Sequence, residues 1–395
     1  MYTTRRAFIT ALAAAIAATA VAGCEGSAMG DGSTDTTTLT IGILAPQTGP
    51  LAAIGTDMLA GWQLYLDQHD GKLGGHPVRV IVAEEGDGGA TARASVDRLI
   101  KQEKASVIVG AASAPAVATA AGPTRDAQIP LIGVGGRPST ISDVAYLWHT
   151  SFDSRDYGKA IAAHIAKTVP GPVWVIGPDY QGGHDQISGF VDAYLAAGGK
   201  LANADGKPVF TPYPATTNFG PWLAQAKASG AKAVYAFYAG APAVEFVRQY
   251  AQFGLHGTVP LYGPAFLTEG AALQAQAAAA AGVYTVANYS PDLPGPANQA
   301  FTTALAGRIK GAPTVYHLTS YDAAALLDKA IAAAGPDPTP QAINTAITAI
   351  TTVDSPRGTW RFNAQHTPVQ AWYLRQVTGA TPANTMVTTL ATIGA

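Results

Sequence analysis

Short apolar runs alternate with longer amphipathic stretches from about residue 39 onward. The short runs are rich in β-branched or aromatic residues and are bounded by Gly, Pro or charged residues, which is typical of buried strands. We therefore expect strands at Leu39–Ala45, Val78–Ala83, Ser106–Val109, Pro130–Val134, Val173–Ile176, Ala233–Phe237, Pro260–Tyr262 and Val283–Ala287.

The longer stretches repeat apolar residues at helical spacing, as Met58, Trp62, Tyr65 and Leu66 do in the first of them. Strands that alternate with helices of this length indicate βαβ units, and near-continuous apolar strands indicate parallel sheets covered on both faces. The expected fold class is therefore α/β. Helices are predicted at Thr56–Gln68, Ala92–Lys104, Ala116–Ala127, Tyr157–Thr168, Gln186–Ala197, Phe219–Ser229, Ala243–Phe253, Asn298–Ile309 and Tyr316–Ala334, and β-like segments at Gly358–Phe362 and Trp372–Val377.

The strand–helix alternation runs twice along the chain. One set occupies about 39–150, and a second starts near Phe152 and ends near Gly282, before helices resume and a β-like tail follows. A chain that completes one lobe, builds another and then returns indicates two doubly wound lobes joined by several crossings. A cleft at the carboxyl ends of the strands, between the lobes, is the expected ligand site.

The first 24 residues have the layout of an export signal. Arg5 and Arg6 precede a short, Ala-rich apolar run, and Cys24, the one cysteine among 395 residues, follows Val-Ala-Gly. The Val-Ala-Gly-Cys segment that ends at Cys24 resembles the lipobox of bacterial lipoproteins, in which the cysteine is lipidated and becomes the first residue of the mature protein. Two acyl chains anchor a protein stably to a membrane. The alternative is that Cys24 is an incidental small residue of an Ala-rich segment.

The residues around Arg5 and Arg6 also resemble a twin-arginine export signal, with an ordinary Sec signal as the alternative. The apolar run is shorter than the roughly 20 residues that a membrane span needs. A stretch at 25–38 with almost no apolar residues then predicts a flexible tether. The resulting expectation is a protein held at the outer face of the cytoplasmic membrane by its lipid anchor alone.

Composition excludes several classes of protein. Apolar content of 48% and charged content of 13% exclude a disordered chain. The net charge is −2 and Lys and Arg form no cluster beyond the signal, so nucleic acid is not an expected partner. One cysteine allows no intramolecular disulfide, and the eight histidines share no metal-ligand spacing, so we expect no metal and no cofactor. We expect a monomer.

Motifs of the common enzyme classes are missing from the sequence. There is no Gly-x-Ser-x-Gly elbow, no His-Glu-x-x-His, and no Gly-x-Gly-x-x-Gly that opens a helix after the first strand. We therefore do not expect an enzyme. An exported hydrolase is the distant alternative, and a ligand-sensing module that does not transport is another.

The first strand and its loop carry a family resemblance. Residues 40–55 closely resemble the opening of type I periplasmic solute-binding proteins of the branched-chain amino acid transporter family. Each motif is weak alone, but their order and spacing are specific and cover essentially Leu39 to about Val377. Further matches, in order, are Asp70–Val80, Val107–Ser113, Ile129–Ile132, Gly177–Tyr180, Phe246–Leu255, Tyr321–Ala323, Ser355–Phe362 and His366–Val377.

The resemblance implies the extracytoplasmic ligand-binding subunit of an ABC importer. In that family two lobes close on a small solute by a hinge motion, and the closed form docks on a permease with its cytoplasmic ATPase. By this analogy lobe one is 39–151 plus 288–353, and lobe two is 152–287 plus 354–395. Three crossings then form the hinge.

The same resemblance suggests which residues of the first lobe contact ligand. The position of Ile54 often faces ligand in the family, although a core role is as plausible. Ser113 precedes a helix whose first N–H groups suit a carboxylate, and it also suits the N-cap. Gly136 lets ligand approach the backbone closely. Arg137 departs from the family pattern, and its guanidinium can pair with a carboxylate, with a solvent-facing role as the alternative.

In the second lobe, Tyr180 matches a tyrosine that often closes over ligand, and Tyr238 follows the next strand at a similar place. Both are expected to stack on a ring or donate hydrogen bonds, with core packing as the alternative. Ala265 and Phe266 stand where amino-acid binders usually place an acid for the ammonium, and Glu269 is too far along the chain to assume that role.

Because a buried ammonium without a partner is costly, we do not expect a simple α-amino acid as ligand. An apolar carboxylate, aliphatic or aromatic, fits Arg137, Tyr180, Tyr238 and Phe266 better. A branched-chain amino acid or an amide is the alternative ligand.

Overall fold

The computed structural model describes residues 37–394. The expected export signal at 1–24, with Arg5, Arg6 and Cys24, lies outside the described residues, as does the tether at 25–38 except for its last two residues. Among the helices of the described part, none is long and apolar enough to cross a membrane.

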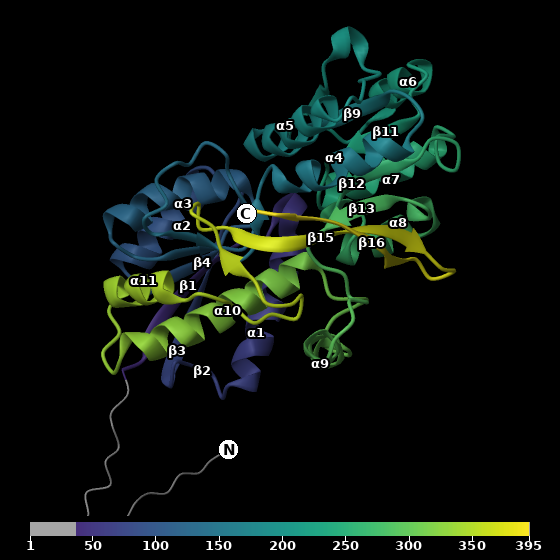
Figure 1. The fold of residues 1–395 in the computed structure, drawn as a ribbon. Coiled ribbons are helices and arrows are strands. Elements are labelled where there is room, and N and C mark those ends of the chain that lie inside the picture. The colour runs from purple at the N-terminus through teal and green to yellow at the C-terminus, as the bar shows by residue number, and fades with distance from the viewer. Residues whose placement is uncertain (1–36, 395) are drawn as a thin grey trace, which may run out of the picture. The chain divides into compact units, whose positions relative to one another are not determined.

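The first sheet has the strand order β2-β3-β1-β4-β5-β7 (Figure 1). Its neighbours pair in parallel apart from the β2–β3 hairpin. The register places Ile43 between Val82 and Val109, so the central strands are apolar throughout. The strands are β1 Leu39–Ala45, β2 Lys72–Leu73, β3 His76–Glu84, β4 Val107–Gly110, β5 Leu131–Gly133 and β7 Leu147–His149.

Helices from two distant parts of the chain cover this sheet. Helix α10 packs against α1 and β2, and α2 packs against β1, β3 and α3. We call the first sheet and these helices the first half. The helices are α1 Ala52–Gln68, which follows the 3₁₀ turn η1 Gly49–Leu51, α2 Ala90–Lys101, α3 Ala114–Asp126, α10 Val315–Ala334 and α11 Pro340–Ala349.

The second sheet has the order β10-β9-β11-β12-β13-β15-β14, with β16 paired to β15. The strands from β10 to β13 are parallel, and the C-terminal strands add to β13 in antiparallel fashion, as the yellow arrows beside green β13 show in Figure 1. The strands are β9 Val173–Asp179, β10 Val209–Pro212, β11 Ala233–Ala236, β12 Leu261–Pro264, β13 Tyr284–Ala287, β14 Arg361–Phe362, β15 Pro368–Thr378 and β16 Ala383–Ile393.

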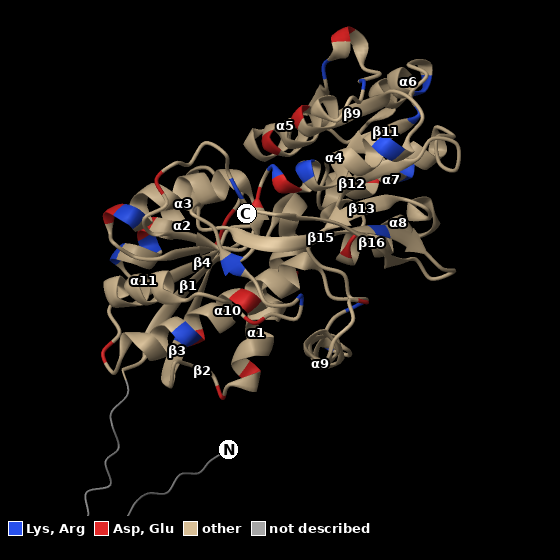
Figure 2. Ribbon diagram, in the orientation of Figure 1, with Lys and Arg blue, Asp and Glu red and all other residues tan. Residues whose placement is uncertain are grey.

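Five helices accompany the second sheet, and together they form what we call the second half. Helices α4 and α5 pack on each other, α4 also contacts β12, β13, β15 and β16, and α7 contacts α6 and α8. Charged residues are scattered over both halves (Figure 2). The helices are α4 Asp156–Thr168, α5 Gln181–Ala196, α6 Gly220–Ala228, α7 Ala241–Gln252 and α8 Gly270–Gln276.

The chain passes between the halves three times: after β7, after β13 and after α11. Beside the first passage, β6 Gly136–Arg137, which lies between β5 and β7, pairs in parallel with β8 Phe152–Asp153, and the second passage leads into α9 Pro296–Leu305. Buried polar groups tie the passages together. Arg357 donates to the Thr150 carbonyl at 2.6 Å and pairs with Asp322 of α10 at 3.0 Å.

The α/β fold with two parallel-strand sheets is confirmed. Each predicted strand overlaps an observed one; the apolar runs of β4, β5, β11 and β12 are buried throughout, whereas most residues of β3 are half-buried. Sequence patterns did not predict β2, β6, β7, β8, β10 and β16. In β16 exposed and half-buried residues mostly alternate, and Thr-rich composition hides that pattern from a search for apolar runs.

Candidate functional site

A small cavity of about 30 Å³ lies at the carboxyl ends of the parallel strands. The first half supplies Ile54, Ala112, Ser113 and Gly136, which follow β1, β4 and β5. We call this the central cavity. The passage between the halves and the second half supply Phe152, Ser154, Tyr180, Gly182, Gln186, Phe237, Ala239 and Phe266. Leu51 of η1, Ala114 of α3 and Tyr316 of α10 complete the lining.

Five aromatic side chains line the central cavity. The Phe266 ring lies at the middle of this group, with centroids 5.5 Å from Phe237, 6.2 Å from Phe152 and 6.3 Å from Tyr316. The ring of Tyr180 is 6.2 Å from Phe237. The Phe237–Phe266 pair is edge to face, so ring faces and ring edges are both presented to the space between them.

The polar groups of the central cavity are neutral. Gln186 is buried, and its Oε1 atom has no hydrogen-bond partner within the described residues. Ser154, Tyr180 and Tyr316 carry hydroxyls. Burial raises the pKa of Tyr180 and of Tyr316 well above the usual value, so both phenols stay protonated and can donate at neutral pH. No Asp, Glu, Lys or Arg lines this cavity in the part of the chain that the structure describes.

Ser113 lies in the cavity wall and caps α3, with its Oγ accepting from the Ala116 N–H at 3.4 Å. Its own N–H and that of Ala112 are already bonded, at 2.9 and 2.7 Å, to the carboxylate of Glu85. The Ser113 hydroxyl donates to the same carboxylate at 2.6 Å. These two N–H groups precede α3 and hold an internal carboxylate, and the Ala116 N–H in the first turn of α3 is bonded to Ser113.

Sequence reasoning missed Glu85, which is fully buried. Burial raises the pKa of its carboxyl to about 7, although three hydrogen bonds to Ser113 and Ala112 oppose this. Its position in the sequence could have indicated a role at the site. Glu85 directly follows β3, at the carboxyl edge of the sheet where the loop after β4 also lies. It contributes an acid directly behind the wall of the cavity.

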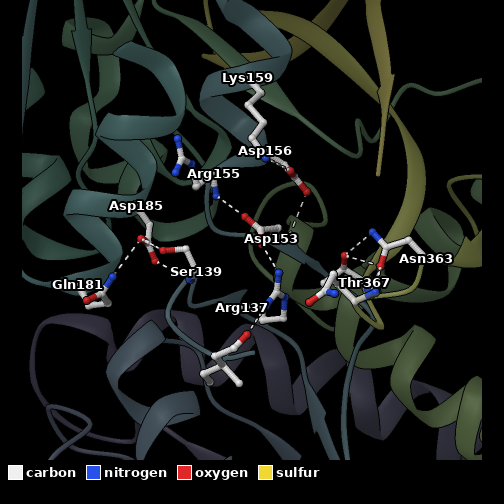
Figure 3. Close-up of polar contacts among 12 residues, drawn as sticks. Arg137, Ser139, Asp153, Arg155, Asp156, Lys159, Gln181, Asp185, Asn363 and Thr367 are labelled. Atoms are coloured by element: carbon white, nitrogen blue, oxygen red, sulfur yellow. Dashed lines mark hydrogen bonds and ion pairs between the residues drawn. The ribbon is translucent and has the colours of Figure 1, made fainter. Parts of the chain in front are cut away.

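Arg137 does not line the central cavity. Its Nη2 pairs with Asp153 at 2.5 Å and its Nη1 donates to the Ile141 carbonyl at 2.9 Å, across the β6–β8 pair (Figure 3). Neither the ligand-binding expectation nor the solvent-facing alternative holds in this structure, because the buried guanidinium of Arg137 pairs with the half-buried carboxylate of Asp153 instead.

Tyr238 also lies outside the cavity and is corrected to a core residue. Its ring packs on Phe219 and Phe246, and its hydroxyl bonds to Thr211 at 3.0 Å. The preceding residue, Phe237, lines the cavity. Successive side chains of an extended segment point to opposite faces, so the expectation chose the wrong one of two adjacent aromatics.

The cavity lining includes the other expected residues, Ile54, Ser113, Gly136, Tyr180 and Phe266. At Gly136 a Cβ atom would lie 2.5 Å from the Ser154 hydroxyl oxygen. The absence of a side chain is therefore what allows these two segments to approach. Ile54 is 8% exposed and serves both the core and the cavity wall.

The two halves touch directly beside the cavity. Ser139, in the loop after β6, hydrogen-bonds to Asp185 of α5 (Figure 3). On the opposite side Gly240, with φ of 61°, comes so close to Pro50 that a Cβ would lie 2.1 Å from the Pro50 carbonyl oxygen. The central cavity is consequently enclosed by both halves.

A larger hollow of about 500 Å³ lies elsewhere on the second half. It is lined by residues at the amino ends of β12 and β13, such as Leu261 and Tyr284, and by His256. Because ligands of parallel α/β sheets bind at the carboxyl ends, we assign the site to the central cavity. Within residues 37–394 no group of three His, Cys, Asp or Glu side chains is placed to hold a metal ion.

Comparisons with known proteins agree on one family. A family model described as periplasmic binding protein matches residues 38–382. The Leu/Ile/Val-binding protein homolog 6 of Brucella melitensis is 27% identical over 266 residues, which cover 66% of this chain and 67% of that protein.

Solved structures agree with this match. A solute-binding protein of an ABC transporter from R. palustris, in complex with benzoate, is 29% identical, with a TM-score of 0.83 over 90% of this chain and 97% of that one. A second R. palustris solute-binding protein, in complex with 4-hydroxybenzoate, is 27% identical, with a TM-score of 0.81 over 90% and 98%. A leucine-binding protein of Thermotoga maritima shares the fold at 18% identity, with a TM-score of 0.79 over 89% and 98%.

Proposed function

Because the chain belongs to the periplasmic binding protein family, we propose that it is the extracytoplasmic substrate-binding subunit of an ABC importer. It captures a small aromatic carboxylate in the central cavity and delivers it to a permease that works with a cytoplasmic ATPase. The benzoate and 4-hydroxybenzoate complexes of relatives with 29% and 27% identity support this ligand class. We assign the chain no catalytic role.

The observation that carries the proposal is the lining of the central cavity. Five aromatic rings surround a space whose polar side chains are the hydroxyls of Ser113, Ser154, Tyr180 and Tyr316 and the amide of Gln186. Aromatic rings hold another ring by stacked and edge-to-face contacts, and neutral donors hold a carboxylate. An ammonium would meet no charged partner among the described lining residues, which disfavours a simple α-amino acid there.

Ligand entry requires the halves to separate. A cavity of 30 Å³ holds about two water molecules, and a benzoate ring is far larger. We propose that the three passages form a hinge between lobe one, 39–151 plus 288–353, and lobe two, 152–287 plus 354–395. Opening about this hinge admits the ligand, and closure encloses it.

A thermal-shift panel with the chain from Glu25 onward tests the ligand class. The panel contains benzoate, hydroxybenzoates, leucine, valine and simple amides, each at several concentrations. A ligand at about 100 times its dissociation constant adds about 2.7 kcal/mol to the free energy of unfolding. We expect shifts with the aromatic acids. Shifts with leucine, valine or an amide, and none with aromatic acids, would contradict the proposal.

We also propose that Cys24 is lipidated and holds the protein at the outer face of the cytoplasmic membrane, as a monomer. The lipobox-like residues before Cys24 support this. In the native host, Cys24→Ser is expected to release the protein from the membrane fraction, and Arg5→Lys with Arg6→Lys is expected to block twin-arginine export. Unchanged fractionation of the Cys24 variant would contradict the anchor.

A further inference from the structure

A second cavity of about 20 Å³ adjoins the central one and shares Ile54, Phe266 and Tyr316 with it. Its remaining wall holds two acidic side chains among small residues. Asp57 comes from α1 in the first half, and Glu269 comes from the residue before α8 in the second half. The central cavity therefore continues into a space with a different chemical character, which we call the acidic cavity.

Glu269 brings an unsatisfied acceptor to this space. The side chain is 6% exposed, and its Oε1 atom accepts from Nη1 of the buried Arg375 at 2.9 Å. Its Oε2 atom is buried and has no hydrogen-bond partner within the described residues. Buried carboxylate oxygens are nearly always hydrogen-bonded, so an oxygen left without a partner beside a cavity indicates a donor supplied from outside the chain.

Asp57 is the second acceptor. Its Oδ2 atom accepts from the Thr314 hydroxyl at 3.0 Å, and its Oδ1 atom lies 3.7 Å from Nε2 of His317, beyond hydrogen-bond distance. Burial raises the pKa of Asp57 to about 7; the Thr314 bond opposes this, and the charge of Glu269 adds to it. The two carboxyls thus lie near enough to repel each other when both are ionised.

The groups around the pair leave an acceptor atom free. Arg375 pairs with Oε1 of Glu269 and leaves Oε2 without a partner. His317 accepts the Thr314 N–H at Nδ1 with 3.1 Å, and burial lowers its pKa to about 3, so it is neutral near pH 7. A hydrogen-bond donor placed between Asp57 and Glu269 would relieve the repulsion and satisfy the free oxygen when the halves close.

We infer that the acidic cavity is a subsite for a hydrogen-bond-donating substituent of the ligand, a hydroxyl or an amino group, which donates to Glu269 and Asp57. The ligand is then a hydroxy- or amino-substituted aromatic carboxylate rather than an unsubstituted one. This inference rests on the proposed function, because it places the ring and the carboxylate in the central cavity. A space of 20 Å³ fits one such group, since a single water needs about 10–15 Å³.

Discrimination against ligands without the donor follows from the same geometry. A methyl group in this position would leave Oε2 of Glu269 and Oδ1 of Asp57 without a donor in a largely buried space. Sites built to hydrogen-bond a substituent reject the analogue that lacks it much more strongly than apolar pockets reject a missing methyl group. We expect a preference of about tenfold or more for the donor-bearing ligand.

Isothermal titration at pH 7 with matched ligand pairs tests the subsite. The ligands are benzoate and its 3- and 4-methyl, 3- and 4-hydroxy and 3- and 4-amino derivatives. In the wild type, the best hydroxy or amino acid should bind at least about tenfold tighter than the methyl acid of the same substitution. Asp57→Asn, which keeps the size and an acceptor for Thr314, should reduce this ratio to about threefold or less.

Two further variants make the result specific. Glu269→Gln should reduce the same ratio, with circular dichroism and a thermal melt to show that the pair with Arg375 is not needed for folding. Asp67→Asn, on the exposed face of the same helix as Asp57, is the matched control and should leave the ratio as in the wild type.

The outcomes separate this inference from the proposed function. If methyl and hydroxy acids bind equally to the wild type, or if neither acidic variant changes the ratio, the subsite is overturned while the aromatic-acid function stands. If none of the aromatic acids binds, the proposed function fails and the inference fails with it.

Discussion

Ser139 and Asp185 are joined by two hydrogen bonds across the boundary between the halves: the Ser139 hydroxyl donates to Oδ1 at 2.5 Å and its N–H donates to Oδ2 at 3.0 Å (Figure 3). Gln181, one turn earlier in α5, also donates to Oδ1 at 3.0 Å. Neither Ser139 nor Asp185 lines the central cavity. Closure is therefore stabilised by contacts that the ligand does not make.

This contact predicts an effect of Ser139→Ala on ligand release. Losing one hydrogen bond to a charged acceptor destabilises the closed form by about 1–2 kcal/mol, so ligand should dissociate roughly five- to thirtyfold faster. Stopped-flow dissociation measures this directly. Ser188→Ala, on the same helix as Asp185, is the control and should leave the rate near that of wild type. Equal rates for both variants would contradict a closing role for Ser139.

Two tyrosines that looked alike in the sequence should respond differently to loss of the hydroxyl. Tyr180→Phe should weaken binding of an aromatic acid by roughly tenfold, because it removes a donor in the cavity wall. Tyr238→Phe should instead lower the free energy of unfolding by about 1 kcal/mol through its lost bond to Thr211, with affinity near wild type. Titration and urea unfolding of both variants check this, and weakened binding in Tyr238→Phe alone would contradict the assignment.

Arg137 is expected to matter for stability. Arg137→Ala leaves the carboxylate of Asp153 without its buried partner, so the free energy of unfolding should fall by about 3–5 kcal/mol. Arg125→Ala, which removes an exposed arginine paired with Asp126 and Asp143, should cost less than about 1 kcal/mol. Urea unfolding compares the two. An Arg137→Ala protein that is as stable as the wild type but no longer binds aromatic acids would contradict this role. It would support the expectation that Arg137 binds the ligand directly.

Stability should fall as pH rises through neutrality. The pKa of Asp57 and of Glu85 is raised to about 7, so in this range the folded chain holds protons that the unfolded chain has released. The stabilisation is present at low pH and is lost as pH rises through 7. The lowered pKa values of the buried His149 and His317 act oppositely, at and below about pH 7, where the unfolded imidazoles take up a proton.

Comparing Asp57→Asn with the wild type between pH 6.5 and 8 isolates the contribution of Asp57, because every other group titrates alike in the two proteins. For Asp57 alone the expected loss of unfolding free energy across it is roughly 0.8 kcal/mol. Urea unfolding at both pH values should show a smaller loss in Asp57→Asn than in the wild type. An identical pH dependence in the two proteins would show that Asp57 is not protonated in the folded state near neutrality.

The order of strands and helices was predictable because burial on both faces imposes apolar runs and helical stripes. The direction of a side chain at the end of a strand was not predictable, as Phe237 and Tyr238 show. Composition does not tell at which residue a strand ends, nor which of two adjacent side chains faces the cavity. The partner of Arg137 was equally hidden, since Asp153 reaches it through the β6–β8 pairing. Asp57 and Glu269 are 212 residues apart in sequence, and only the closed fold brings them to one cavity.

Isothermal titration of benzoate and of leucine into the wild-type chain, started at Glu25 and freed of bound ligand by unfolding and refolding, tests the central claim most directly. The account predicts saturable binding of benzoate or its hydroxy derivatives, with one site per chain, and no measurable heat of binding for leucine. Saturable binding of leucine with no binding of any of the aromatic acids would contradict it and would place the ammonium partner in the acidic cavity.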